Sequence, residues 1–453
     1  MKTVISKHAY RLICAMVQVA IAVLIFISFY KWHVADTAAI LSDKGPAALL
    51  IAIYLLMYVF IGRTIHAFMI GVEQTEKVAA SHVIAFFINW IIEVFATVTI
   101  IDNLKSFWYI MGVYLLMTFI QSIISLVFVF SLTKLYHHLY PPLRLLMIYG
   151  DYENEVEDKM NSLTAKFHIE DSMSYREGLK AIKRSIVNYD AVLINDIPAK
   201  ARNKVLKICF DMDKRVYFVP TISDVIIRSA EDMNLLDTPL YLCRNSGITA
   251  IEAIIKRFFD ILISVIALIV LSPLMLVVAV AVKLEDKGPV FFCQERVTIG
   301  GRVFKMIKFR SMYENVEESG VARPAGENDD RITKVGRIIR TTRIDELPQL
   351  INIIKGDMSI VGPRPDCKEN IDLFTREIPE FVLRTKVKAG LTGYAQVYGK
   401  YSTYPLDKLK MDVYYIMNYS LLLDFRIIVE TLKIVFQKDS AQGLSEKRIE
   451  KFR

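Results

Sequence analysis

The sequence ILISVIALIVLSPLMLVVAVAV, residues Ile261–Val282, carries no acidic or basic side chain. About 20 apolar residues are enough for a helix to cross a bilayer, so this stretch could span a membrane. Its centre, Ser272-Pro273, predicts a break, because a proline inside a helix lacks a backbone donor and clashes with the carbonyl four residues earlier. Basic side chains flank the stretch on both sides: Lys256, Arg257 and Lys283. Since basic flanks favour the cytoplasm, we predict a re-entrant helix over residues 258–283, with a kinked crossing helix as the alternative.

Further apolar segments lie upstream, within the first 142 residues: Leu12–Tyr30, Gly45–Gly62, Val78–Ile101 and Ser106–Thr133. Each has about the length of a transmembrane helix, and together they predict a four-helix transmembrane bundle over residues 1–142. The third segment contains Glu93. A carboxylate inside a membrane indicates function by default, although Glu93 could instead pair with Asn89 or reach the head groups.

The composition is that of a protein with both membrane and aqueous parts, because 53% of the residues are hydrophobic and 23% are charged. The net charge of +8 suits anionic lipids or phosphorylated substrates. A nucleic-acid partner is not expected, since the basic residues lack interleaved aromatic side chains. The cysteines are scattered without a CxxC pair, which argues against a disulfide framework or a thiolate metal site.

Residues 143–250 alternate short apolar runs with amphipathic stretches, a pattern typical of βαβ units and a parallel sheet. The expected strands are Leu143–Tyr149, Ala191–Ile194 and Val216–Val219, and the expected helices are Glu177–Val187 and Ala199–Phe210. The first strand ends in Tyr149-Gly150-Asp151 without further glycines, so the loop that holds a dinucleotide pyrophosphate is missing. We predict a degenerate Rossmann-like domain for packing or regulation, with nucleotide binding as the less favoured alternative.

An acidic pair, Asp345 and Glu346, directly follows three arginines spaced three residues apart: Arg337, Arg340 and Arg343. On a helix these arginines would form one stripe that could clamp a pyrophosphate. We expect the neighbouring arginines to keep the carboxylates ionised with a lowered pKa, as a nucleophile or a Mg²⁺ ligand requires. A surface cluster of salt bridges is the alternative interpretation.

Other cations and polar residues could complete a phosphate site around this pair. Gly362-Pro363-Arg364-Pro365 predicts a stiff loop that presents one guanidinium with little ordering cost. Lys308 and Arg310 alternate with apolar residues, which could place both cations on one face of a strand or of a short helix. Gln294 and Arg296 follow a Gly-Pro turn and are further candidates.

The order of the motifs in the second half of the chain identifies a resemblance. The motifs are FCQER (Phe292–Arg296), KFRSM (Lys308–Met312), DELPQL (Asp345–Leu350), KGDMS (Lys355–Ser359), GPRP (Gly362–Pro365) and GLTGYAQV (Gly390–Val397). From about Lys256 to Lys438 the chain resembles the bacterial sugar transferase family, the monotopic polyprenyl-phosphate phosphoglycosyl transferases. The preceding bundle and Rossmann-like domain resemble the large form of that family, which starts exopolysaccharide, capsule or O-antigen units.

The resemblance implies that Asp345 attacks the β-phosphate of a UDP-sugar and that Asp345 and Glu346 hold Mg²⁺. The attack releases UMP and leaves an aspartyl phosphosugar, which undecaprenyl phosphate captures. The resemblance also implies that Arg340 binds phosphate and that Ser272-Pro273 is the break of the family's re-entrant helix. The family's Pro-Arg-Pro motif falls on Pro363, Arg364 and Pro365.

Some positions depart from the family pattern: Thr298, Arg343, Ile344 and Lys400. The acidic pair is intact, so these departures concern donor recognition. The alternatives in other functional classes are a nucleotide-sugar glycosyltransferase, which would release UDP, and a non-catalytic membrane scaffold or regulator of polysaccharide assembly.

The predicted fold class is a membrane α protein with an α/β insert. Its parts are a four-helix bundle (1–142), a degenerate Rossmann-like domain (143–250), a mainly α phosphoglycosyl transferase domain at the membrane interface (251–438) and a charged tail (439–453). We expect a multi-pass protein of the bacterial cytoplasmic membrane whose catalytic domain faces the cytoplasm. The expected partners are a UDP-sugar, undecaprenyl phosphate and membrane lipids, and a homodimer through the bundle or the middle domain is plausible.

Overall fold

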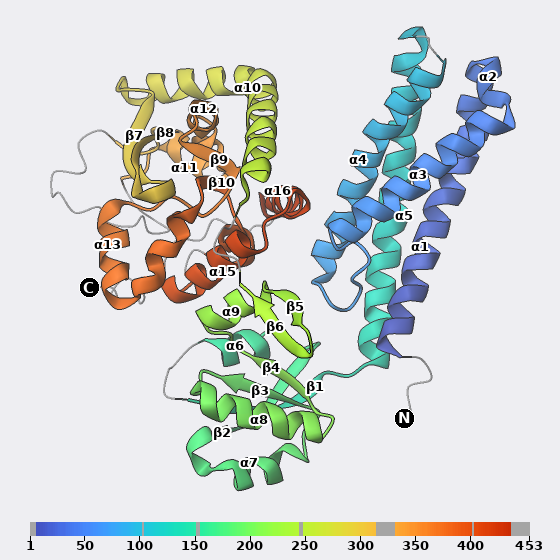
Figure 1. The fold of residues 1–453 in the computed structure, drawn as a ribbon. Helices are drawn as coiled ribbons and strands as arrows, with labels where there is room; N and C mark the ends of the chain where they lie inside the picture. Colours follow the sequence, from blue (N-terminus) through green and yellow to red (C-terminus); the bar gives the residue numbers. More distant parts are fainter. Residues whose placement is uncertain are drawn as a thin grey trace. The chain divides into compact units, whose positions relative to one another are not determined.

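The computed structural model describes residues 6–101, 104–150, 155–243, 248–313, 331–400 and 403–435. The chain is mostly helical and divides into two compact units, Met1–Pro220 and Thr221–Arg453 (Figure 1). The charged tail predicted over residues 439–453 lies outside the described residues.

The four predicted apolar helices are confirmed in the first unit. They are α1 (Lys7–Phe29), α3 (Lys44–Thr64), α4 (Thr75–Ile101) and α5 (Phe107–Leu139), with the short α2 (Ala39–Ser42) between the first two. Each long helix is apolar enough to cross a membrane, and the four pack side by side (Figure 1). Stacked aromatic rings fill the centre of the bundle, with ring centroids 4.4 Å apart for Phe26 and Tyr54 and 4.8 Å apart for Tyr58 and Phe86.

Glu93 lies fully buried inside this bundle on α4. Neither of its carboxylate oxygens has a hydrogen-bond partner in the part of the chain that the structure describes. Asn89 does not pair with it; the Asn89 amide nitrogen donates to the carbonyl of Tyr54 at 3.2 Å instead. The polar interior of the bundle is therefore connected between helices, but Glu93 takes no part in that hydrogen bonding.

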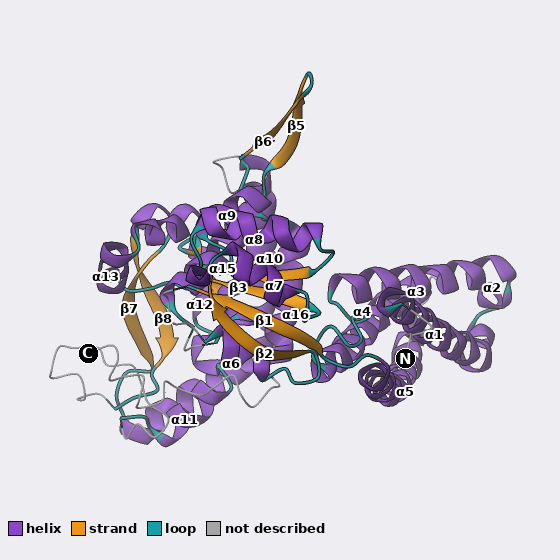
Figure 2. Ribbon diagram, turned by 90° about the horizontal axis from the view of Figure 1, so that it is seen from below, coloured by secondary structure: helices purple, strands orange, loops and turns teal. Residues whose placement is uncertain are grey.

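A parallel four-stranded sheet follows the bundle, in the order β2-β1-β3-β4, and Figure 2 shows β2, β1 and β3 of this sheet. Its elements are β1 (Leu143–Tyr149), α6 (Val156–Asn161), β2 (Phe167–Ser174), α7 (Leu179–Ile186), β3 (Ala191–Asn195), α8 (Ala199–Asp211) and β4 (Arg215–Phe218). The predicted strands and helices are confirmed. Strand β2 was not predicted from the sequence, because this edge strand is mostly polar and only two of its eight residues are buried.

Gly150 at the end of β1 has a packing role. A Cβ atom there would lie 1.9 Å from the carbonyl oxygen of Asp196, so only glycine allows the ends of β1 and β3 to approach this closely. Asp151, the last residue of the predicted degenerate loop, lies outside the described residues.

The second unit combines helices with three two-stranded sheets among its described residues. It begins with α9 (Ile222–Arg228), the hairpin β5 (Glu231–Leu235) and β6 (Thr238–Leu242), α10 (Ala250–Asp286), and the hairpin β7 (Phe291–Val297) and β8 (Val303–Phe309). It continues with α11 (Lys334–Thr341), the 3-10 turn η6 (Ile344–Glu346), α12 (Gln349–Lys355), β9 (Met358–Val361), α13 (Lys368–Glu377), the 3-10 segment η7 (Pro379–Lys386), β10 (Ala389–Thr392), α14 (Tyr394–Tyr398), α15 (Pro405–Met417) and α16 (Leu421–Val435). Its largest core gathers apolar residues from β8, α12, β9, α15 and α16.

Helix α10 contains the apolar stretch Ile261–Val282, and it bends sharply along its length (Figure 1). Pro273 lies inside the helix, so the carbonyl of Ile269, four residues earlier, loses its backbone donor. The Ser272 hydroxyl donates to that carbonyl at 2.8 Å. The Ser-Pro pair therefore interrupts helical hydrogen bonding without leaving this carbonyl unpaired, which matters in an apolar environment.

Candidate active site

The acidic pair lies on η6, the single turn between α11 and α12. Arg343, directly before this turn, has a left-handed backbone with φ of 56°. Residues other than glycine rarely adopt this conformation, and clusters of such residues are typical of functional sites. Here it turns the chain out of α11 and sets the direction of Asp345 and Glu346.

Glu346 is held by two cations from different elements. Lys308 Nζ on β8 lies 3.2 Å from Glu346 Oε1, and Arg364 Nη2 lies 2.8 Å from the same oxygen. The Glu346 side chain is only 12% exposed. A strand, a turn and a loop thus converge on one carboxylate.

The two adjacent carboxylates have opposite pKa shifts. Burial alone would raise the pKa of Glu346, but the charges of Arg364 and Lys308 outweigh it and lower the pKa well below its usual range. Burial and the charge of Glu346 raise the pKa of Asp345 to about 6, against the opposing effect of Lys308, Arg340 and Arg364. The expected lowered pKa is confirmed for Glu346 and wrong for Asp345, because desolvation and a like charge dominate there.

The three arginines before the pair do not form one helical stripe, because α11 ends at Thr341. Arg340 in its last turn lies close enough to Asp345 to oppose the rise of that pKa, and its Nη1 donates to Ser311 Oγ at 3.4 Å. Arg343 lies beyond the helix, and its positive charge helps to lower the pKa of Glu346. Arg337 is exposed, and its side chain has no partner within the described segments.

The two candidate cations around the end of β8 have different surroundings. Lys308 reaches Glu346, whereas the buried Arg310 forms an ion pair with Asp286 at the end of α10. Gly288 makes room for this guanidinium, since a Cβ there would lie 2.0 Å from Arg310 Nη1. The structure therefore brings Lys308 to the acidic pair and pairs Arg310 with the end of α10.

Gln294 and Arg296 on β7 bind each other, with Arg296 Nη2 donating to Gln294 Oε1 at 2.6 Å. Arg296 Nη1 also contacts Cys367 Sγ at 3.0 Å, which places it beside the segment after Pro365. The next residues along the chain, Val297 and Thr298, line a hollow of about 230 Å³ together with Pro363 and Arg364.

The residue that holds the Arg364 loop, Arg384, was not predicted from the sequence. Arg384 in η7 is buried, and its Nη2 donates to the backbone carbonyl of Arg364 at 3.0 Å. The same guanidinium pairs with Asp366 and, at 2.9 Å, with Asp412 on α15. Pro363 and Pro365, on either side of Arg364, are buried. These partners are far apart in sequence, so no local pattern could have indicated them.

The acidic pair offers two neighbouring carboxylates to a Mg²⁺ ion. No group of three or more His, Cys, Asp or Glu side chains that could hold a metal occurs in the described ranges. Mg²⁺ is commonly bound by one or two carboxylates together with substrate phosphates and water. The Asp345 carboxylate has no hydrogen-bond partner among the described residues, so it is available as a ligand. The pair therefore fits a Mg²⁺ ion that takes its other ligands from a phosphate.

Comparisons with known proteins match the part of the chain that carries this site. A family model described as bacterial sugar transferase matches residues 251–438. The chain is 41% identical over 263 residues to UDP-N-acetylgalactosamine-undecaprenyl-phosphate N-acetylgalactosaminephosphotransferase of Aeromonas hydrophila, which covers 55% of this chain and 59% of that protein. It is 38% identical over 231 residues to UDP-glucose:undecaprenyl-phosphate glucose-1-phosphate transferase of Klebsiella pneumoniae, 50% of each chain.

The matches to these two larger relatives thus span about half of their length. A smaller relative is covered almost whole: exopolysaccharide production protein ExoY of Sinorhizobium fredii is 39% identical over 213 residues, 44% of this chain and 93% of that protein. With the family model and the ordered motifs, this match shows that the chain belongs to the bacterial sugar transferase family.

Proposed function

We propose that the protein transfers a sugar-1-phosphate from a UDP-sugar to undecaprenyl phosphate, releasing UMP, as the first membrane step of exopolysaccharide, capsule or O-antigen synthesis. The observation that carries this proposal is the acidic pair with Lys308, Arg340 and Arg364 gathered around it. The names of the relatives, which act on UDP-sugars and undecaprenyl phosphate, support it.

Asp345 is the nucleophile in this proposal. One of its carboxylate oxygens attacks the β-phosphorus of the UDP-sugar, the bond from that phosphorus to the bridging oxygen breaks, and UMP leaves with the oxygen. Asp345 suits this role better than Glu346, because two cations already engage Glu346 and make it a weak base. With a pKa of about 6, Asp345 is ionised at neutral pH yet more basic than an ordinary aspartate.

The basic side chains stabilise the charge of the transferred group. Lys308, Arg340 and Arg364 come from three different elements, so they can surround a diphosphate from several sides. Fixed cations of this kind stabilise the charge that develops during phosphoryl transfer without reorganising. Arg384 keeps the Arg364 backbone in place for this contact.

The second step returns the enzyme to its first state. A phosphate oxygen of undecaprenyl phosphate attacks the phosphorus of the aspartyl phosphosugar, and the bond to the Asp345 oxygen breaks. The product is a lipid diphosphate sugar, and no water is consumed. Mg²⁺, held by Asp345 and Glu346, would neutralise part of the phosphate charge when bound.

The bent α10 supports a re-entrant position in the membrane. A straight helix of this length would separate its ends by about 55 Å. Arg257 near its start and Glu285 near its end nevertheless both bind elements of the second unit. Both ends then lie on one side of the bilayer, with the acidic pair at the interface where a lipid phosphate meets a soluble nucleotide. We place that side in the cytoplasm of a bacterium.

The test is nucleotide release from a panel of UDP-hexoses with Mg²⁺ and undecaprenyl phosphate, run beside Asp345→Asn. We expect UMP from one donor, and a loss of at least about a thousandfold in the variant, as is typical when a nucleophile is removed. Release of UDP would instead indicate a glycosyltransferase. No nucleotide release from any donor in the panel would favour the non-catalytic scaffold. Normal turnover in Asp345→Asn would show that Asp345 is not the nucleophile.

A further inference from the structure

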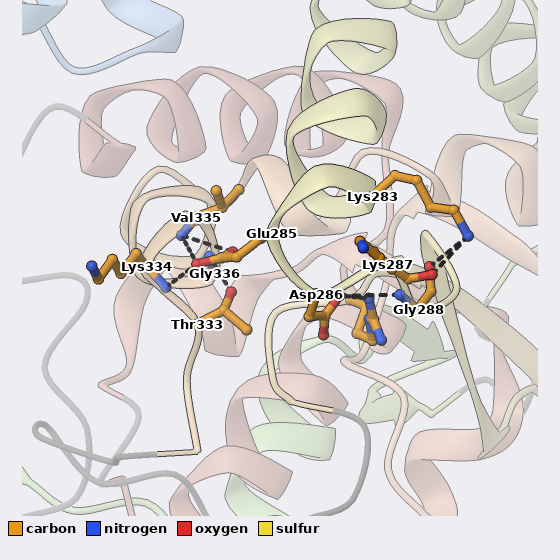
Figure 3. Close-up of polar contacts among 10 residues, drawn as sticks. Lys283, Glu285, Asp286, Lys287, Gly288, Thr333, Lys334, Val335 and Gly336 are labelled. Atoms are coloured by element: carbon orange, nitrogen blue, oxygen red, sulfur yellow. Dashed lines mark hydrogen bonds and ion pairs between the residues drawn. The ribbon is translucent and has the colours of Figure 1, made fainter.

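Near its C-terminal end, α10 caps the helix that precedes the acidic pair. The Glu285 carboxylate accepts hydrogen bonds from the backbone amides of Lys334, at 2.7 Å, and Val335, at 3.2 Å (Figure 3). These are the first two amides of α11. Thr333 Oγ1 accepts from the third, that of Gly336, at 2.8 Å, and the Thr333 carbonyl accepts from the fourth, that of Arg337.

The bond to Arg337 is the first regular bond of the helix, and the three amides before it are all satisfied by side chains, two of them by Glu285 of α10. The fourth amide that a helix leaves unpaired, that of Thr333, donates to the carbonyl of Ser311 at 3.1 Å. The negative charge of Glu285 also suits the positive end of the α11 dipole. Apolar packing adds to the contact, because Val278 and Val282 of α10 share a buried cluster with Ile339 of α11.

Near its N-terminal end, α10 binds the helix that follows the acidic pair. Arg257 Nη1 donates to the carbonyl of Ile353 at 2.5 Å, and Nη2 donates to that of Ile354 at 2.7 Å. Both carbonyls lie in the last turn of α12, where a cation suits the negative end of the helix dipole. Gly356 ends this helix with φ of 94°, a left-handed backbone conformation that favours glycine.

We propose that Arg257 and Glu285 are positioning residues that bracket the acidic pair from the two ends of the membrane helix. This inference rests on the proposed function. Glu285 acts through α11, whose last turn carries Arg340, and Arg257 acts through α12, which begins just after Glu346. The bend at Pro273 allows one helix to supply both ends of the bracket.

The bracket should act on the chemical step more than on donor binding. Neither side chain belongs to the acidic pair. Each binds the end of a helix, α11 or α12, whose opposite end lies next to the pair. A tilt of α11 or α12 would shift Arg340 or η6 by a fraction of an ångström. Small misplacements of this kind reduce the alignment needed in the transition state and can cost up to about a hundredfold in rate.

The kinetic test compares Glu285→Ala and Arg257→Ala with matched variants on α13. Glu369→Ala removes an exposed acid from the first turn of that helix, and Arg376→Ala removes an exposed cation from its last turn. We expect kcat for UMP release to fall about tenfold in Glu285→Ala and in Arg257→Ala, with KM for the UDP-sugar within about twofold. The α13 variants should keep the rate of the unmodified protein.

Conservative variants separate positioning from mere folding. Glu285→Gln can still accept from the α11 amides and should recover most of the rate, and Arg257→Lys can still donate to one carbonyl and should recover part of it. Should the alanine variants fail to accumulate, Lys334→Pro removes one donor to Glu285 at a helix position that tolerates proline, and it should lower kcat by itself.

Hydrogen exchange tests the bracket without any activity. In the full chain in nanodiscs, the Lys334 and Val335 amides should exchange about tenfold faster in Glu285→Ala than in the unmodified protein or in Glu369→Ala. Unchanged exchange, unchanged kcat, or a change in KM alone would overturn the proposal. If the unmodified protein releases no UMP from any donor, the proposed function fails, while the exchange result still decides whether α10 holds α11.

Discussion

The helices of the bundle and helix α10 are similarly apolar, but they differ in how much of their surface the protein buries and in where their polar contacts lie. In the bundle helices, 22% to 39% of the residues in the apolar window are buried within the protein, whereas in α10 only 11% are. The bundle places polar groups at its centre, such as Gln121, which donates to Tyr54 Oη at 2.8 Å. Helix α10 instead concentrates its polar contacts at its two ends.

Hydropathy therefore identifies a membrane helix but does not indicate what the helix binds. The middle of α10 exposes apolar side chains such as Ile269, Val270 and Leu276, as a helix surrounded by lipid should. Its ends bind the catalytic elements through Lys256, Arg257, Glu285 and Asp286. The bundle helices mainly bind one another, and α10 mainly binds the unit that carries the active site.

The largest expected effect comes from making α10 resemble a bundle helix. Pro273→Ala restores the donor for the Ile269 carbonyl and favours a straight helix, which cannot keep both ends on the same unit. We expect UMP release to fall by at least about a hundredfold.

Topology is measured by labelling two exposed cysteines on either side of α10, Cys243 and Cys293, with a membrane-impermeant maleimide. In the unmodified protein both should react from the same side of the membrane. Reaction from opposite sides would show that α10 crosses the bilayer, and full activity in Pro273→Ala would show that the bend is dispensable.

An intermediate effect is expected from the buried ion pair near the start of α10. Lys256 Nζ lies 2.5 Å from Asp424 Oδ2 on α16, and the Tyr415 hydroxyl donates to the other oxygen at 2.8 Å. Lys256→Met would leave Asp424 buried without its cation, and we expect the free energy of unfolding to fall by about 3 to 5 kcal/mol. Chemical unfolding of the full chain in detergent measures this loss.

The loss of stability in Lys256→Met should depend on pH in a definite direction. Burial raises the pKa of Asp424 above its ordinary value even though Lys256 opposes the rise. An acid with a raised pKa in the folded state favours folding when protonated, so the loss in Lys256→Met should grow as pH rises through that pKa. Adding Asp424→Asn should restore most of the stability and remove the pH dependence. If Lys256→Met alone were as stable as the unmodified protein, the ion pair of Lys256 with Asp424 would not anchor α10.

The smallest effect is expected inside the bundle, at Glu93. Since its oxygens have no partner within the described residues, Glu93→Leu should raise the free energy of unfolding by about 1 to 3 kcal/mol. UMP release should be unchanged, because the bundle supplies none of the site residues. Thermal unfolding and the UMP assay check both expectations, with Glu93→Gln as the polar control. A loss of activity with normal stability would instead make Glu93 a functional carboxylate.

Much of the fold could be predicted because its patterns are local. The bundle helices and the buried strands are continuous apolar runs, and Pro273 marks the bend within α10. The polar edge strand β2 and the hairpin β5–β6 gave no such signal. In the site, the motifs indicated Asp345, Glu346 and Arg364, but Arg384 went unnoticed because its partners lie 18 and 28 residues away.

The apolar segments, the bend of the membrane helix and the candidate residues for the chemistry can be identified without a structure, because each of them depends on residues close together in the chain. The difference between Asp345 and Glu346, in contrast, arises only when the chain folds. Burial raises the pKa of one, and two cations from distant segments lower that of the other. Desolvation and Coulomb interactions depend on distances in space, which neighbouring positions in sequence do not determine.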